Sequence, residues 1–114
     1  MKKIKLNLDY KVKFDADKDI DLDLEYAKLT QGYVDYAVSA AHISGLTGPE
    51  RRIFGRISSK IEEAVANKVY EIELEDKDLR FLQDCFLSDK CKFQATLANY
   101  INVLEDELLK DIKG

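Results

Sequence analysis

The sequence predicts an α+β fold with a three-stranded antiparallel sheet and helices on one face, in the order ββααβαα. Residues 3–26 and 69–74 alternate between apolar and polar side chains, which is the period of strands. The segments between and after them carry apolar residues at helical spacing. With 114 residues, of which 46% are apolar, the chain can bury one modest core, so we expect a single α+β domain over 1–114.

The first strand signal is too long for one strand. Even-numbered positions carry large apolar side chains through most of 3–26, and the exceptions fall among short polar residues that favour a turn. We therefore predict an N-terminal hairpin over 3–26. In that register Lys13 faces Asp21 and Lys11 faces Asp23, and each such cross-strand pair contributes about 0.2–1 kcal/mol.

Helix signals follow the predicted hairpin. Thr30 is a candidate N-cap for a helix over about 30–44. Gly45 suits the left-handed residue that follows a helix. Thr47 and Glu50 have the spacing of a capping box, so a second helix is expected over about 48–67.

The second half of the chain continues with one strand and two helices. Residues 69–74 alternate, with Glu71 and Glu73 directed outward, and we expect them to form the third strand beside the hairpin. Asp76 is a candidate cap for a helix over about 77–88. A final helix is expected over about 92–111, where apolar residues form one stripe.

The layout resembles that of small proteins of tailed phages and prophages. The features that carry the resemblance are the lysine-led opening MKKIKLNL at 1–8, the strand VYEIELED at 69–76 and the helix start DLRFL at 78–82. The resemblance covers most of the chain and concerns layout and composition. It implies a context of phage assembly or of interference with host machinery, and it assigns no catalytic residue.

Alternating acids mark the first candidate surface, at Asp15, Asp17, Asp19 and Glu25. The first three imitate the opening of a calcium loop, but such a loop needs Gly at position 20 and an acid at position 26, where this chain has Ile and Tyr. A solvated strand face explains the same residues. A third interpretation is that the carboxylates mimic phosphates and bind a basic partner.

Tyrosines mark the second candidate surface. Tyr33 and Tyr36 lie beside the alanine-rich segment 37–41, whose small side chains allow another helix to approach closely. Such a segment serves either packing within the chain or a contact with a partner or a second copy. Both tyrosines are therefore candidate partner-binding residues.

A basic stripe is the candidate surface of a different function. Arg52, Arg56 and Lys60 recur every four residues, with Arg51 beside them, so on a helix they face one way and can contact phosphates. The alternative interpretation is a solvated helix face. A net charge of −4 gives no overall attraction to nucleic acid or to an anionic membrane.

Residues suited to catalysis are few. His42 is the only imidazole, and the five glycines are scattered, so neither a nucleophilic triad nor a phosphate-binding loop is indicated. A zinc site would need more ligands than Cys85 and Cys91 with one His. We interpret both cysteines as structural thiols, with a disulfide or redox pair as the alternative. No enzyme activity, metal or cofactor is predicted.

No apolar run is long enough for a signal region or a membrane span, so we expect a cytoplasmic protein. The predicted function is a non-catalytic interaction or regulatory module that binds a protein partner or itself. The alternative function is a nucleic-acid-binding regulatory protein that uses Arg51, Arg52, Arg56 and Lys60.

Overall fold

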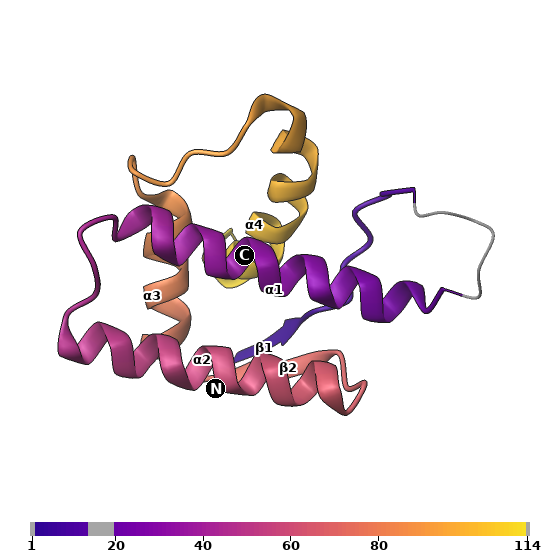
Figure 1. Ribbon diagram of the computed structural model, residues 1–114, viewed down its shortest axis with the longest axis horizontal. Coiled ribbons are helices and arrows are strands. Elements are labelled where there is room, and N and C mark those ends of the chain that lie inside the picture. Colours follow the sequence, from indigo (N-terminus) through magenta and orange to yellow (C-terminus); the bar gives the residue numbers. More distant parts are fainter. Residues whose placement is uncertain (1, 14–19, 114) are drawn as a thin grey trace.

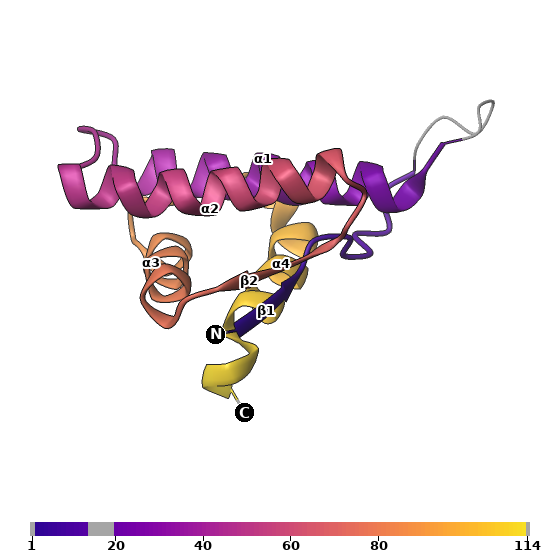
Figure 2. The same cartoon turned by 90° about the horizontal axis from the view of Figure 1, so that it is seen from below.

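The computed structural model describes residues 2–13 and 20–113, and it contains two layers (Figures 1 and 2). The long helices α1, Leu22–Ala41, and α2, Gly48–Ala66, run antiparallel and form one layer. The short strands β1, Lys2–Lys5, and β2, Glu71–Leu74, form the other layer with the two later helices. Those helices are α3, Asp76–Leu87, and α4, Ala98–Lys113, which follows a 3-10 turn, η1, at Ala95–Leu97.

The predicted three-stranded sheet is wrong, because the described residues contain one two-stranded sheet and the order βααβαα with the added turn η1. β1 pairs with β2 in antiparallel register, so that Ile4 lies opposite Ile72. The described residues of 3–26 do not pair as the predicted hairpin, since β1 pairs with β2 and residues 22–26 belong to a helix. The predicted pairs Lys13–Asp21 and Lys11–Asp23 are replaced, because residue 21 caps a helix and residue 23 lies in its first turn.

The hairpin prediction was wrong because the segment after residue 20 fits both the period of a strand and that of a helix. Its alternating apolar residues fit a strand, but Asp21 accepts a hydrogen bond from Leu24 N (3.2 Å) and caps α1. Asp23 and Glu25 then occupy the first turn, where carboxylates interact favourably with the helix dipole. Burial recurs at helical spacing along α1 and starts five residues after its beginning, at Ala27, Thr30, Val34, Ala37 and Val38.

Thr30 is a buried link inside α1 instead of its predicted cap. The Tyr10 hydroxyl lies 2.6 Å from Thr30 Oγ1, which in turn lies 2.6 Å from the carbonyl oxygen of Leu6. The Tyr10 phenol donates to the threonine and the threonine donates onward to the carbonyl, so each buried polar atom is satisfied. Burial raises the pKa of Tyr10 and keeps its phenol as a donor. This relay fastens the extended segment after β1 onto α1.

The later elements lie close to their expected bounds. Thr47 and Glu50 form the expected capping box, with Thr47 N donating to Glu50 Oε1 at 2.8 Å. Gly45 has the left-handed φ of 102°. Glu75, and not Asp76, is the N-cap of α3. The helix expected over 92–111 begins later, because the chain up to residue 94 remains extended before η1.

One hydrophobic cluster joins all the elements and contains the largest fully buried side chains of both layers. Buried polar groups are paired at its boundary. Asp78 is 1% exposed and accepts two hydrogen bonds from Arg56, from Nε at 3.1 Å and from Nη2 at 2.8 Å. Gln83 Nε2 donates to the Leu108 carbonyl at 2.8 Å and ties α3 to α4. These contacts fix the positions of α2, α3 and α4.

Candidate functional site

A groove with an aromatic wall lies where α1 meets the connection between α3 and α4. It has a volume of about 390 Å³. We call it the aromatic groove, and its lining residues are Lys28, Leu29, Gly32, Tyr33, Tyr36, Phe93, Gln94 and Leu97. None of them is fully buried, so the groove is open to the surface.

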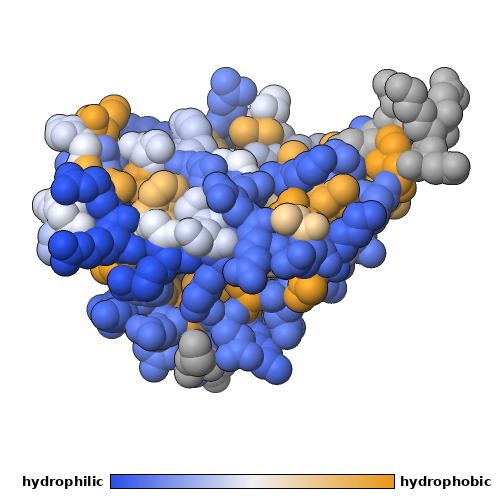
Figure 3. Space-filling view, turned by 60° about the horizontal axis from the view of Figure 1, so that its bottom comes forward, coloured by the Kyte–Doolittle hydropathy of each residue, from blue (hydrophilic) through white to orange (hydrophobic). Residues whose placement is uncertain are grey.

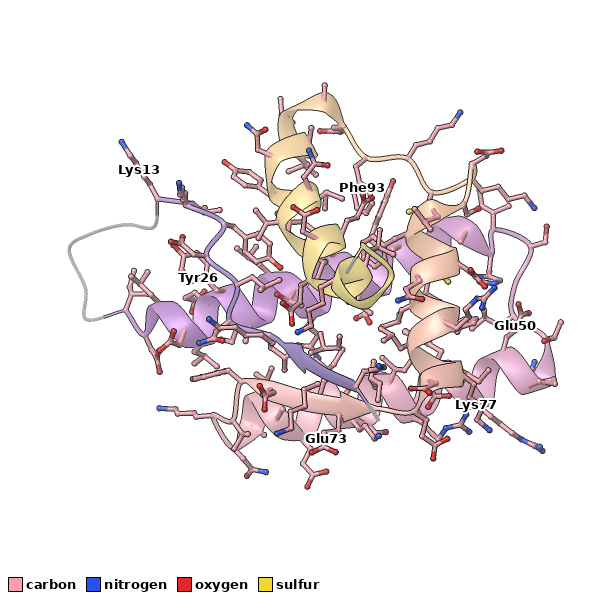
Figure 4. All side chains as sticks on the ribbon, turned by 180° about the vertical axis from the view of Figure 1, so that it is seen from behind. Lys13, Tyr26, Glu50, Glu73, Lys77 and Phe93 are labelled. Atoms are coloured by element: carbon pink, nitrogen blue, oxygen red, sulfur yellow. The ribbon has the colours of Figure 1, made fainter. Side chains whose placement is uncertain are left out.

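Residues of α1 line one side of the aromatic groove, and Phe93 contributes to the opposite side. Phe93 projects inward from the connection between α3 and α4 (Figure 4). Its ring centroid lies 4.9 Å from that of Tyr36, 6.5 Å from that of Tyr33 and 6.1 Å from that of Phe86. The ring is tilted against Tyr36, edge-on to Tyr33 and stacked with Phe86. Insertion of Phe93 keeps the residues around it out of the expected helix.

The two tyrosines predicted as partner-binding residues both line this groove. The Tyr36 hydroxyl donates to the Lys92 carbonyl at 2.8 Å, so its polar end is occupied and its ring, half exposed, faces outward. The Tyr33 ring packs edge-on against Tyr10, with centroids 5.6 Å apart. Burial raises the pKa of Tyr33. The wall therefore offers aromatic surface and few free polar groups.

Gly32 opens the floor of the groove. It lies in the interior of α1, where glycine is unfavourable by about 0.5–1 kcal/mol relative to alanine. A Cβ built on Gly32 meets no atom within 4 Å, so packing inside the chain does not require a glycine there. The missing side chain leaves space between Tyr33, Tyr36 and Phe93.

The acidic candidates do not join this groove. Asp15, Asp17 and Asp19 lie outside the described residues. Glu25 lies in the first turn of α1, and its carboxylate is 3.9 Å from Lys28 Nζ on the groove rim. Within the described ranges, no group of three or more His, Cys, Asp or Glu side chains is arranged to hold a metal ion.

The basic stripe is largely engaged by the protein itself. The deepest hydrophilic colour in Figure 3 gathers over the first half of α2, where Arg51, Arg52 and Arg56 lie. Arg56 is paired with buried Asp78, and that hydrogen-bonded pair raises the pKa of the guanidinium. Arg51 donates to the Leu46 carbonyl at 3.3 Å.

Lys60, the last member of the stripe, donates to the Glu73 carbonyl at 2.7 Å. Three of the four cations thus hold parts of the fold in place, and a phosphate would have to compete with those contacts. This use of the cations favours the interpretation of a structural helix face over one of a phosphate-binding face.

A thiol, an imidazole and a carboxylate adjoin at the other end of α1. Cys85 Sγ lies 3.9 Å from His42 Nδ1, and His42 Nε2 lies 2.9 Å from Glu50 Oε2. The Val38 carbonyl lies 2.9 Å from the same Nδ1 and can only accept, so this nitrogen carries the hydrogen and cannot take the proton of the thiol.

Burial raises the pKa of Cys85 to about 12, which keeps the sulfur protonated. Cys85 and Cys91 are both free thiols. The thiolate is the nucleophile in cysteine chemistry. This cluster therefore provides structural contacts at the turn between α1 and α2 and supplies no activated nucleophile.

The sequence interpretation missed the six other lining residues of the groove: Lys28, Leu29, Gly32, Phe93, Gln94 and Leu97. Gly32 carried a signal, since it occupies a helix interior where most residues are more favourable. Phe93 carried none, because its place in the expected helical stripe gave it an ordinary core role. Among residues 2–13 and 20–113 no helix combines the length and the apolar character needed to cross a membrane.

Comparison of the chain with protein-family models, with curated proteins and with solved structures found no match.

Proposed function

We propose that the chain is a non-catalytic interaction module whose aromatic groove binds an apolar side chain of a protein partner. The observation that carries the proposal is an open groove lined by the rings of Tyr33, Tyr36 and Phe93, in which Gly32 presents no side chain. Gly55 of α2 also occupies a helix interior with open space around its Cβ, so the support for a ligand comes from the three aromatic rings that line the groove beside Gly32.

The lining of the groove indicates the chemistry of the ligand. Leu29 and Leu97 add aliphatic surface to the aromatic wall, and Lys28 supplies a positive charge on the rim. A surface groove of this size accepts one or two side chains inserted from outside. The partner segment therefore carries an aromatic or leucine side chain with an acidic residue beside it, which can pair with Lys28 in place of Glu25.

The resemblance to small phage proteins suggests where such a module acts. In that context the partner is a host or phage protein in the host cytoplasm, or a further copy of the chain. Nucleic-acid binding through Arg51, Arg52, Arg56 and Lys60 is the weaker alternative, because three of these side chains already bind acceptors within the fold.

A peptide selection tests the proposal without a known partner. A displayed library of random peptides is selected on the wild-type protein and counted again on two variants, Gly32→Leu and Gly55→Leu. Gly32→Leu fills the groove, whereas Gly55 lies on an exposed part of α2 where a Cβ also meets no atom within 4 Å. The two variants therefore match in chemistry and differ in place.

We expect the selection to enrich peptides with an aromatic or leucine residue next to an acid. These peptides should bind the Gly55→Leu protein as they bind the wild type and should lose at least tenfold in affinity for the Gly32→Leu protein. Enriched peptides that bind both variants equally, or a selection without any groove-dependent peptide, would contradict the proposed function.

A further inference from the structure

The outer edge of β2 is a second surface with the geometry of a binding site. Within the described residues the sheet has two strands, so each strand has one edge that pairs with no other strand. β1 lies between β2 and α4, so α4 covers the free edge of β1, whereas the free edge of β2 faces away from α4 (Figure 4). Between β2 and α2 there is a groove of about 340 Å³ that runs along this edge.

The register of the sheet sets the direction of the backbone groups. Leu6 N donates to Tyr70 O at 2.8 Å, so this opposed pair occupies a hydrogen-bonded position of the ladder. Hydrogen-bonded and non-hydrogen-bonded pairs alternate in an antiparallel ladder. Ile72 therefore bonds to β1, whereas Glu71 and Glu73 turn their N–H and C=O groups outward.

Two side-chain contacts agree with this alternation. On β1, Lys5 N points away from β2 and donates to Glu107 Oε2 of α4 at 2.8 Å. On β2, the Glu73 carbonyl points away from β1 and accepts from Lys60 Nζ at 2.7 Å. The outward N–H groups of Glu71 and Glu73 face the groove, where an added strand would find them.

Charge defines which strand fits there. The Glu71 and Glu73 side chains are exposed on the outer face of the sheet, where they lie opposite Lys5 and Lys3 of β1. Part of β1 thus shows a pattern that pairs with β2, because Lys3 and Lys5 flank the buried Ile4. On the free side Glu63 of α2 adds a third acid to the groove, and the one cation in the lining, Lys60, is already bound to the Glu73 carbonyl.

The other face of an added strand would meet apolar surface. Ala64 of α2 and Ile72 of β2 line the groove, and Val69 at its end is 55% exposed. The small side chain of Ala64 leaves space for short apolar residues that alternate with the basic ones. Backbone bonding, charge and shape thus select the same kind of segment.

We propose that the outer edge of β2 binds an extended segment of a partner polypeptide in which lysine or arginine alternates with small apolar residues. The segment joins the sheet by main-chain hydrogen bonds to the N–H groups of Glu71 and Glu73 and to the Glu71 carbonyl, since the Glu73 carbonyl is held by Lys60. Its basic side chains lie beside the two glutamates. This surface is separate from the aromatic groove and does not depend on the function proposed for that groove.

The probe is a capped seven-residue peptide that alternates lysine with valine, titrated into the whole protein at low salt. Amide hydrogen exchange is followed residue by residue. In the free protein we expect the amides of Glu71 and Glu73 to exchange at least tenfold faster than those of Ile72 and Leu74, which bond to β1. Peptide binding should slow the two glutamate amides at least tenfold.

Two variants separate strand addition from simple charge attraction. Glu71→Pro removes an outward N–H and leaves the bonds between β1 and β2 in place, because proline is tolerated at such edge positions. It should lower affinity at least tenfold while the melting temperature shows that the fold persists. Glu71→Gln combined with Glu73→Gln should weaken binding several-fold and reduce its salt dependence, whereas Asp89→Asn, on a distant exposed turn, should change neither.

The result that would overturn the proposal is binding that leaves the Glu71 and Glu73 amides unprotected. Equal binding of a peptide with the same composition but with its lysines grouped at one end would overturn it as well. Protection of these amides in the free protein that rises with protein concentration would assign the edge to a second copy of the chain, and so would exclude the proposed partner.

Discussion

Replacing Gly32 with alanine should stabilise the protein, although the residue lines its proposed binding site. Gly32 lies in the interior of α1 and an added Cβ meets no atom within 4 Å, so the substitution introduces no clash. Alanine is better than glycine in a helix by about 0.5–1 kcal/mol. With an unfolding entropy of about 2.1 cal/mol/K per residue, this gain raises the melting temperature by about 2–4 °C.

The assay is thermal and urea unfolding of the wild type, Gly32→Ala and Gly55→Ala, followed by circular dichroism. Gly55 is the matched control because it also occupies a helix interior with open space around its Cβ. Both variants should gain stability by similar amounts, and only substitutions at position 32 should affect ligands of the aromatic groove. A loss of stability in Gly32→Ala alone would refute the description of this residue as a helical glycine that faces open space.

The remaining predictions concern contacts that hold the fold. Asp78→Asn should cost about 1–3 kcal/mol in urea unfolding, because a buried charge-assisted pair is lost. The hydrogen bond from Arg56 lowers the pKa of Asp78 below its ordinary 3.8. The stability that ionised Asp78 contributes is therefore complete above pH 3.8 and is lost as the pH falls through the lowered pKa. The Asp78→Asn protein lacks this contribution, so it should lose less stability in acid than the wild type. Cys85, 2% exposed, should react with a thiol reagent only on unfolding, whereas Cys91 should react sooner, and equal rates in the native protein would contradict the burial. Thr47→Ala should destabilise the protein by about 1 kcal/mol through loss of the cap of α2, and an unchanged urea midpoint would contradict that role.

Local signals in the sequence predicted the middle of the fold. The capping box of Thr47 and Glu50, the left-handed Gly45 and the alternation in 69–74 each depend on a few neighbouring residues, and α2 and β2 lie close to the expected bounds. The sequence also predicted that the even positions of 4–10 face the core, and Ile4 and Tyr10 are both buried.

The N-terminal prediction was wrong where two local patterns coincide. Leu22, Leu24 and Tyr26 alternate as in a strand, whereas Asp21 and the acids that follow it also match the start of a helix. The prediction followed the long alternation and took Thr30, instead of Asp21, as the cap of the first helix. What decides between them is tertiary packing, because α1 has to cover the segment 6–10, and that contact is not visible in a local window.

The candidate site was predicted only in part. Tyr33 and Tyr36 were selected for their position beside small residues, but the third ring, Phe93, reaches them from a segment nearly sixty residues away. The basic stripe was predicted as a possible binding surface, but Arg56 is engaged by the protein itself, because its acceptor Asp78 is buried on another helix. Periodicity predicts the face of a helix on which a residue lies, and it does not predict which distant residue meets it.

The pairing of the two strands has a consequence for synthesis on the ribosome. β1 is made first, yet its partner β2 is translated about 70 residues later, so the first strand waits while α1 and α2 can already pair with each other. During that interval Ile4 of β1 lacks its partner Ile72 and can associate with other chains. The lysines at positions 2, 3 and 5 surround Ile4 with charge of one sign, which opposes such association until β2 arrives.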